Sequence, residues 1–141
     1  MKDFQRFDVY SEDVMAGLHD HRDAGHQLEV YLSNTAPSKE NHAVKTDVAE
    51  IATGNGYTGP MDTENDITRT GAVTRVTGST VQVQASGGEV GPFRYAVYYN
   101  ATSGGRLIGF WDYEEAVTLN DNDSFQIQFP SDLMVAGNSG T

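Results

Sequence analysis

Residues 91–129 read GPFRYAVYYNATSGGRLIGFWDYEEAVTLNDNDSFQIQF, and their pattern decides the fold class. Short apolar and aromatic runs alternate with clusters of Gly, Asn, Asp and Ser. Runs of this length, bounded by turn-forming residues, are typical of antiparallel strands. No catalytic motif lies within the runs. The stretch therefore predicts an all-β domain and favours a binding or structural role over an enzymatic one.

Residues 107–113 are apolar on both faces of an expected strand. Because successive side chains of a strand point to opposite faces, Leu107 and Trp111 should share one face. Ile108 and Phe110 should share the other. A strand that is apolar on both faces is typical of a position covered on both sides, so we expect it at the centre of the domain.

The rest of the chain adds shorter strand signals. Strands are expected at residues 27–32, 67–76, 81–85, 93–99, 117–119 and 125–129, and Gly71 suggests a bulge or kink in the second of them. One helical turn is expected at 47–52 and a long loop at 54–66. In the first of these, Leu28, Val30 and Leu32 should face the core, whereas Glu29 and Tyr31 should face outward. The pattern predicts an antiparallel β-sandwich, with a jelly-roll-like arrangement as the leading topology.

The chain has 141 residues, a length typical of one domain. We expect an N-terminal arm at residues 1–26 with a short helix over 11–18, capped by Ser11, then a β-sandwich at 27–130 and a tail at 131–141. Apolar residues of both ends need a surface to cover them. The candidate interface residues are Phe4, Phe7, Leu133, Met134 and Val135.

The composition excludes several functional classes. The net charge is −11 with only nine Lys and Arg residues, which argues against nucleic-acid binding and against anionic membrane surfaces. No apolar run has the length of a signal peptide or of a membrane span, so we expect a soluble protein made inside a cell. Cysteine is absent, which rules out disulfides and thiolate metal sites.

Histidine and carboxylate side chains gather in one short segment. His19, His21 and His26 lie with Asp20 and Asp23 within eight residues. Imidazole and carboxylate groups are ligands of Zn²⁺ and similar ions. The polar, Gly-containing composition is instead typical of a solvated loop, and we favour that interpretation over a metal site.

Three further motifs carry weaker signals. The GNGYTG stretch at residues 54–59 matches a dinucleotide-binding pattern, but Pro60 and a polar loop follow where a helix is needed, so we expect a glycine turn. The NDND stretch at 120–123 lacks the further ligands of a Ca²⁺ loop and predicts a hairpin turn. The acidic residues of 112–115 fall in an expected turn and should be solvated. We therefore predict no catalytic residue, no cofactor and no metal site.

Aromatic residues cluster in the second half of the chain. An exposed Trp–Tyr platform could stack on sugar rings, but an ordinary sandwich core is the favoured interpretation. The cluster comprises Phe93, Tyr95, Tyr98, Tyr99, Phe110, Trp111 and Tyr113.

Three segments resemble a family of small structural proteins of tailed bacteriophages. They are LEVYLSNTAPS at residues 28–38, DVAEIATGNGYTG at 47–59 and GPFRYAVYYNATSGGRLIGFWDY at 91–113, and a closing F-x-I-x-F strand follows. The resemblance covers about residues 27–129. It implies a virion component similar to capsid cement or decoration proteins, with a jelly-roll-type fold and a commonly trimeric state.

Several expectations follow from this resemblance. The chain should bind the major capsid protein and copies of itself, as a homotrimer on the outer surface of the head, after synthesis in the host cytoplasm. It should clamp neighbouring capsid subunits and perform no catalysis. The alternatives are a receptor- or glycan-binding tail or fibre module, which would expose Trp111 or Tyr98 in a groove, and a tail or connector subunit.

Overall fold

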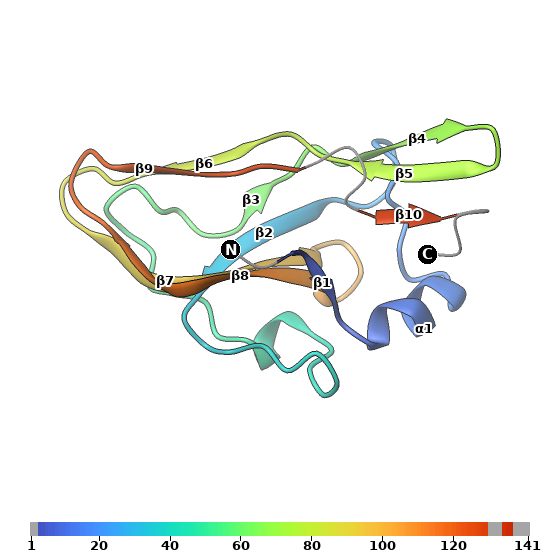
Figure 1. The fold of residues 1–141 in the computed structure, drawn as a ribbon, viewed down its shortest axis with the longest axis horizontal. Coiled ribbons are helices and arrows are strands. Elements are labelled where there is room, and N and C mark those ends of the chain that lie inside the picture. Colours follow the sequence, from blue (N-terminus) through green and yellow to red (C-terminus); the bar gives the residue numbers. More distant parts are fainter. Residues whose placement is uncertain (1–2, 130–133, 137–141) are drawn as a thin grey trace.

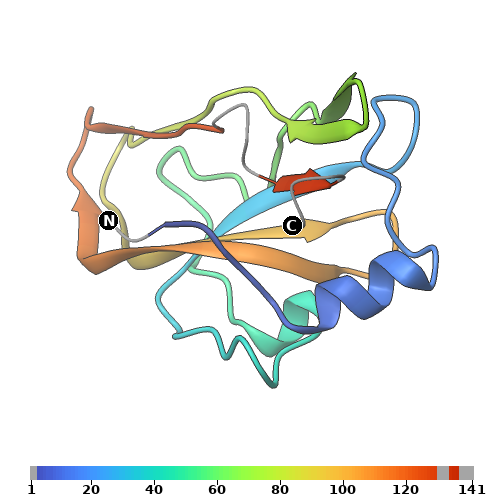
Figure 2. The same ribbon diagram turned by 45° about the vertical axis from the view of Figure 1, so that its right-hand side comes forward.

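The fold is known from a computed structural model, which describes residues 3–129 and the backbone of residues 134–136. Two layers of antiparallel strands face one another (Figures 1 and 2). The elements are β1 (Gln5–Arg6), α1 (Val9–Met15), β2 (Leu28–Ser33), the 3-10 turn η1 (Lys45–Asp47), β3 (Met61–Asp62), β4 (Asp66–Thr70), β5 (Val73–Thr77), β6 (Val81–Gln84), β7 (Val90–Asn100), β8 (Arg106–Leu119), β9 (Ser124–Ile127) and β10 (Met134–Ala136).

One layer is a five-stranded sheet in the order β1-β8-β7-β2-β3. The other layer consists of the sheet β10-β5-β4 and the pair β6-β9. All strand pairs are antiparallel. The prediction of an all-β, antiparallel, sandwich-like fold with one short helix is confirmed, whereas the jelly-roll topology stays a prediction.

The main core fills the space between the two layers. It contains Val30, Tyr98, Ile108 and Trp111 from the large sheet and Val83 from the opposite layer. Burying such apolar side chains stabilises the fold by roughly 1.5–3 kcal/mol for each large residue. The main core therefore holds the two layers together.

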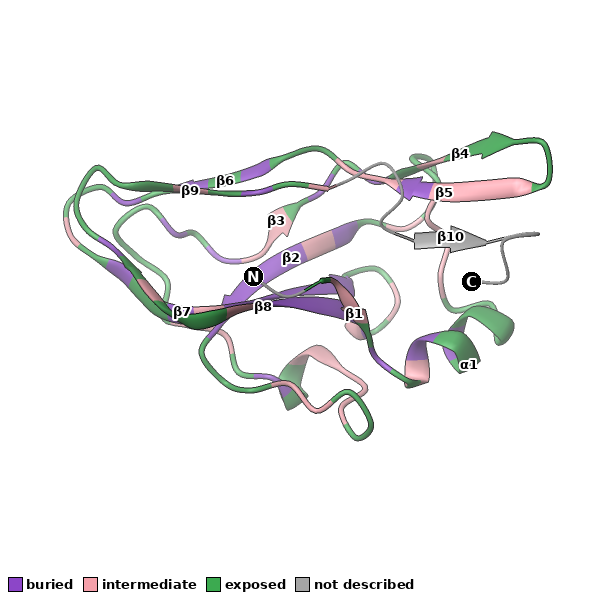
Figure 3. Cartoon of the chain, viewed as in Figure 1, coloured by how far each residue is buried: buried purple, intermediate pink, exposed green. Residues whose placement is uncertain are grey.

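A second apolar cluster covers the outer face of the large sheet. Tyr31, Leu107 and Phe110 lie there beneath Phe7, which precedes α1, and Val48, which follows η1. β7 and β8 are consequently buried on both faces over much of their length, as Figure 3 shows in purple. The expected central strand is confirmed.

The predicted faces of this central strand were wrong in detail. Leu107 shares the outer cluster with Phe110, and Ile108 shares the main core with Trp111. The cause is a register shift, because Tyr98 pairs with Gly109 whereas the next residue, Tyr99, pairs with Leu107. One extra residue in β8 exchanges the faces beyond it.

The helix forms earlier than predicted. It spans Val9–Met15 rather than residues 11–18, and Asp8 rather than Ser11 occupies the N-cap position. It ends because Gly17 adopts a positive φ of 77° and donates its N–H to the Val14 carbonyl. Left-handed glycines of this kind commonly terminate helices.

Two strand predictions also need correction. Residues 67–76 are not one kinked strand, because Gly71 (φ 62°) lies in the turn of a β4–β5 hairpin. The acidic residues at 112–115 and the expected short strand at 117–119 belong to the single long strand β8, in which Glu114 has a φ of 72°. The chain therefore bends at Glu114 without leaving the strand. Asp112 is not solvated as expected, because it is buried and accepts two hydrogen bonds from Arg94 of β7.

Other loops follow the sequence more closely. The GNGYTG stretch is the predicted glycine turn, with positive φ at Gly54, Asn55, Gly56 and Gly59. The expected long loop at 54–66 also contains the short strand β3. The NDND stretch is a turn with Asn122 in the left-handed region, but it joins β8 to β9, which lie in different sheets, and so it is not a hairpin.

Candidate functional site

The most unusual polar feature is a cluster of histidines where α1 meets the ends of β7 and β8. The rings of His19 and His21 stack with centroids 5.8 Å apart, and the Tyr10 ring of α1 lies 5.1 Å from the His19 ring. The His19 side chain is fully buried. The solvated-loop interpretation was therefore wrong for these side chains, although residues 22–25 of the same loop are exposed.

Asn100, the last residue of β7, is the hub of this histidine cluster. Its side chain is buried, and its Nδ2 lies 3.0 Å from both His19 Nδ1 and His26 Nδ1. Its Oδ1 accepts the backbone N–H groups of Thr102 and Ser103. One amide thus ties the histidine loop to the turn between β7 and β8.

His21 contacts the helix. Its Nε2 lies 2.7 Å from the hydroxyl of Tyr10. Two buried ring nitrogens, His19 Nε2 and His21 Nδ1, have no hydrogen-bond partner among the described residues. Burial, more than any neighbouring charge, lowers the pKa of both histidines to about 4, so both rings are neutral at pH 7.

A buried ion pair lies beside the rings. The Asp13 carboxylate of α1 accepts two hydrogen bonds from the Arg106 guanidinium of β8, at 2.8 and 2.9 Å. Asp13 Oδ2 is also 4.0 Å from His19 Nε2. The pair fixes α1 against the sheet and places a charged group next to the neutral imidazoles.

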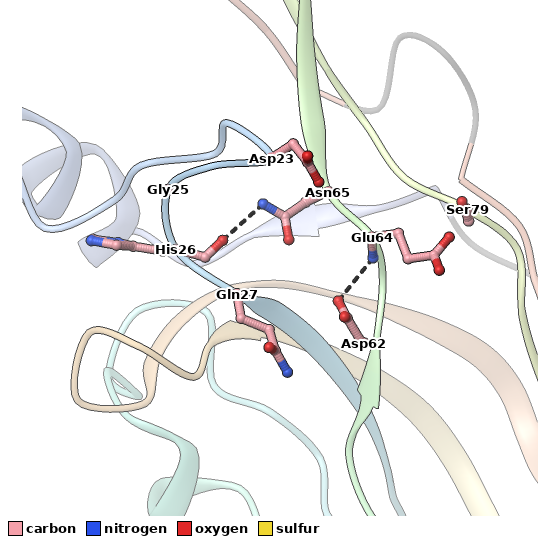
Figure 4. A pocket seen from close by; sticks show the side chains of 8 residues that line it. All are labelled: Asp23, Gly25, His26, Gln27, Asp62, Glu64, Asn65 and Ser79. Atoms are coloured by element: carbon pink, nitrogen blue, oxygen red, sulfur yellow. Dashed lines mark hydrogen bonds between the residues drawn. The ribbon is translucent and has the colours of Figure 1, made fainter.

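A polar cleft of about 580 Å³ opens on the other side of His26 (Figure 4). Its lining residues are Asp23, Gly25, His26, Gln27, Asp62, Glu64, Asn65 and Ser79. The Asn65 amide donates to the carbonyls of His21 and His26 and accepts the Leu28 N–H, so it anchors the histidine loop to this cleft.

One carboxylate of the cleft, that of Asp62, has a structural partner, and the Asp66 carboxylate outside the cleft binds the backbone of Asp23. Asp62 accepts the Glu64 N–H at 2.9 Å, as drawn in Figure 4. Asp66, at the start of β4, accepts the Asp23 N–H at 3.2 Å. Among the described residues, no group of three or more His, Asp and Glu side chains has a geometry that could hold a metal ion. The cleft can offer hydrogen bonds and negative charge to a polar molecule, but it shows no built ligand site.

Several of the expected interface residues make contacts within the chain itself. Phe7 is buried in the outer apolar cluster, and Phe4 packs on Trp111 with centroids 4.7 Å apart. Met134 and Val135 lie in β10, whose backbone pairs with β5. Leu133 lies outside the described residues. In the isolated chain, Phe7 is thus not available to a partner.

The aromatic cluster is core, as the favoured interpretation held. Tyr98 is fully buried and Trp111 is 4% exposed. Phe4 and Phe129 cover this pair from the two ends of the chain, with Phe129 5.3 Å from Trp111. No open aromatic platform is formed by these two residues.

Apolar surface appears instead at the end of α1. Val14, Met15 and Leu18 are the large apolar side chains that stand exposed among the described residues, and Met15 is 89% exposed. We call these three residues the α1 patch. The sequence placed them in a helix but gave no sign of which side would stay uncovered, because the helix packs through Tyr10 and Asp13.

Comparisons with known proteins identify no relative. No protein-family profile matches the chain, and no curated protein and no solved structure matches it either. Within the described residues, no helix has the length and apolar character that a membrane crossing requires.

Proposed function

We propose that the chain is a structural binding protein that decorates the outer shell of a tailed-phage head. It acts by attaching to the major capsid protein and bridging neighbouring subunits, without catalysis. Support comes from the resemblance of residues 28–38, 47–59 and 91–113 to small structural proteins of tailed phages. It also comes from the fold, in which these segments form strands and connections of the sandwich.

The observation that carries the proposal is the α1 patch. Exposed apolar residues grouped in one place on an acidic protein are typical of a protein–protein contact, since such contacts bury an apolar centre within a polar rim. The exposed, acidic Glu12 on the same helix contributes to such a rim. We assign the patch to the capsid contact, in place of the buried Phe7.

A homotrimer strengthens this attachment. The patch is small, so one copy contributes modest affinity. Three linked copies bind the shell with an avidity that exceeds the single affinity by orders of magnitude, provided that all three patches reach the lattice together. The homotrimer is part of the same proposal.

A binding experiment tests the proposal. Purified protein is mixed with heads from a tailed phage that encodes the chain, after the native copies have been stripped, and bound protein is measured by sedimentation. Wild-type protein should bind at saturable sites, and Met15→Glu should weaken binding at least about tenfold. The control is Ala72→Glu, which adds the same charge at the exposed β4–β5 turn. Absence of wild-type binding would overturn the proposed function.

The glycan-binding alternative requires an exposed Trp111 or Tyr98. Both side chains are buried under Phe4 and Phe129, which disfavours it. A tail or connector subunit is distinguished by where the chain is found in the particle and by its copy number.

A further inference from the structure

The orientation of the Asn100 amide can be deduced from its neighbours. Its Oδ1 receives the backbone N–H groups of Thr102 and Ser103, each at 3.0 Å, and a backbone nitrogen can only donate. Nδ2 must therefore point to the histidines. An amide nitrogen can only donate as well, so in its contacts with His19 Nδ1 and His26 Nδ1 the imidazole nitrogens accept, and the Leu18 carbonyl accepts a third, longer contact at 3.4 Å.

Protonation of His19 conflicts with this arrangement. An imidazolium carries a hydrogen on both nitrogens and can no longer accept. The Nδ1–H of a charged His19 would face the N–H of Asn100, donor against donor. His26 Nδ1 also accepts the backbone N–H of Asp20 at 3.2 Å, which ties the His26 ring to the same loop.

His21 adds a second conflict. Its Nε2 is held by Tyr10, and its Nδ1 is buried without a partner among the described residues. A proton on both nitrogens would leave one buried N–H unsatisfied. Leaving a buried donor unpaired is unfavourable, the more so when the group is charged.

The charged groups around the cluster do little to compensate for new positive charge. From α1 the cluster faces Asp13, which Arg106 of β8 already pairs. From the loop it faces Asp20, which pairs with Arg22. Arg6 of β1 has its guanidinium carbon 6.0 Å from the centre of the Tyr10 ring. Each carboxylate thus has a cation of its own, and the three histidines would repel one another.

We propose that His19, His21 and His26 form an acid-sensitive latch that holds the loop of residues 18–27 and α1 against the ends of β7 and β8. In the neutral state Asn100 and Tyr10 keep the latch closed. The Asp13–Arg106 pair and the Asn65 bonds also hold α1 and the loop, so protonation, by breaking the bonds to Asn100, shifts the equilibrium towards an open state in which loop and helix leave the sheet. The sandwich remains folded in that state. The α1 patch moves with the helix, yet the latch operates in the isolated chain and is tested without any capsid.

The pH window follows from the closed and open states. Burial holds the pKa of His19 and His21 at about 4, against 6.5 for a free imidazole. The open state therefore takes up protons first, and opening becomes easier as the pH falls from about 6.5 towards about 4. Between pH 7 and pH 5 each of the two histidines increases the opening constant about twentyfold.

Amide hydrogen exchange on the full chain tests the latch. The reporters are the N–H groups of Leu18 and His26, which bond to the carbonyls of Asp13 and Asp20, and the reference is the β7–β8 ladder. After correction for intrinsic rates, the protection of the reporters relative to the ladder should fall about four-hundredfold from pH 7 to pH 5, since His19 and His21 contribute about twentyfold each. This window lies above the ordinary pKa of carboxyl groups, so their titration contributes little.

Two variants complete the test. In His19→Asn, the Asn Oδ1 replaces Nδ1 as the hydrogen-bond acceptor and cannot be protonated. The fall in relative protection of the reporters between pH 7 and pH 5 should therefore be about twentyfold smaller than in the wild type. His42→Asn is the control, since His42 lies outside the cluster and accepts the Ser38 N–H. Unchanged relative protection in the wild type at pH 5 overturns the proposal, whether or not the variants fold. An equal fall in relative protection in the wild type and in His19→Asn also overturns the proposal.

Discussion

Asp13 and Arg106 join α1 to β8 through two parallel hydrogen bonds, with Asp13 Oδ1 and Oδ2 2.9 and 2.8 Å from the guanidinium nitrogens. The Asp13 side chain is almost fully buried, whereas that of Arg106 is 26% exposed. Removing the cation leaves a buried carboxylate without its partner. We expect Arg106→Gln to lower the free energy of unfolding by about 2–4 kcal/mol, measured by urea denaturation.

The control for this prediction is another arginine–aspartate pair. Arg22 and Asp20 also form a close ion pair, but the Arg22 side chain is 66% exposed. Exposed pairs contribute little, so Arg22→Gln should leave the free energy of unfolding essentially unchanged. Equal effects of the two substitutions would show that the Asp13 site is not desolvated.

Gly109 permits the N-terminal strand to lie against β8. A Cβ at this position would meet the Phe4 ring and lie 2.6 Å from the backbone carbonyl oxygen of Gln5. Gly109→Ala should therefore displace β1 and cost roughly 1–3 kcal/mol in thermal or urea unfolding.

The double variant that combines Gly109→Ala with Phe4→Ala distinguishes the clash with the Phe4 ring from the clash with the Gln5 carbonyl oxygen. Removing the ring relieves only the side-chain clash, because the Gln5 oxygen belongs to the backbone. The second substitution should therefore fail to restore wild-type stability. Full restoration would mean that β1 is not held by its pairing with β8.

Buried tyrosines should make the protein sensitive to alkali. Burial raises the pKa of Tyr10 to about 12, and burial also raises that of Tyr31, Tyr57, Tyr98, Tyr99 and Tyr113. A free tyrosine ionises near pH 10, so above that pH the unfolded chain loses protons that the folded chain keeps. Stability should fall as the pH rises past 10, by up to about 1.4 kcal/mol per pH unit for each such tyrosine.

Phenolate absorbance follows this transition directly. Most tyrosines should remain protonated until the chain unfolds, and their ionisation should then coincide with the loss of the far-ultraviolet circular dichroism signal. Smooth ionisation near pH 10 in a chain that stays folded would contradict the assigned burial.

Trp111 reports on the glycan-binding alternative. It is the single tryptophan of the chain and is 4% exposed between Phe4 and Phe129. Its fluorescence should be blue-shifted, resistant to acrylamide quenching and unchanged by saccharides. Phe4→Ala should shift the emission to the red. A spectral change on adding a glycan to the wild type would revive the receptor-binding interpretation.

The positions of the strands could be predicted from the sequence. The direction in which each side chain points and the segments that pack against each strand could not. Alternation predicted a strand at residues 27–32, within one residue of the observed β2 at Leu28–Ser33. Tyr31 was expected to face outward, yet it is fully buried because η1 and Val48 cover the outer face of the sheet. Its hydroxyl donates to the Val48 carbonyl at 2.7 Å. A covering segment distant in sequence leaves no trace in the local pattern of a strand.

The histidine cluster shows the same limit for the candidate site. The sequence brought His19, His21 and His26 together, but their burial depends on Asn100, which lies more than seventy residues further along the chain. The turn residues around Asn100 looked like an ordinary connection. Only the pairing of β7 with β8 brings this side chain under the loop.

Quantitative mass spectrometry of purified, tail-free phage heads tests the proposed decoration role most directly. We predict that the chain is present in heads at a copy number that scales with the number of major capsid subunits, and that it remains after tails are removed. Recovery only in tail fractions, or a copy number limited to one ring per particle, would contradict this role.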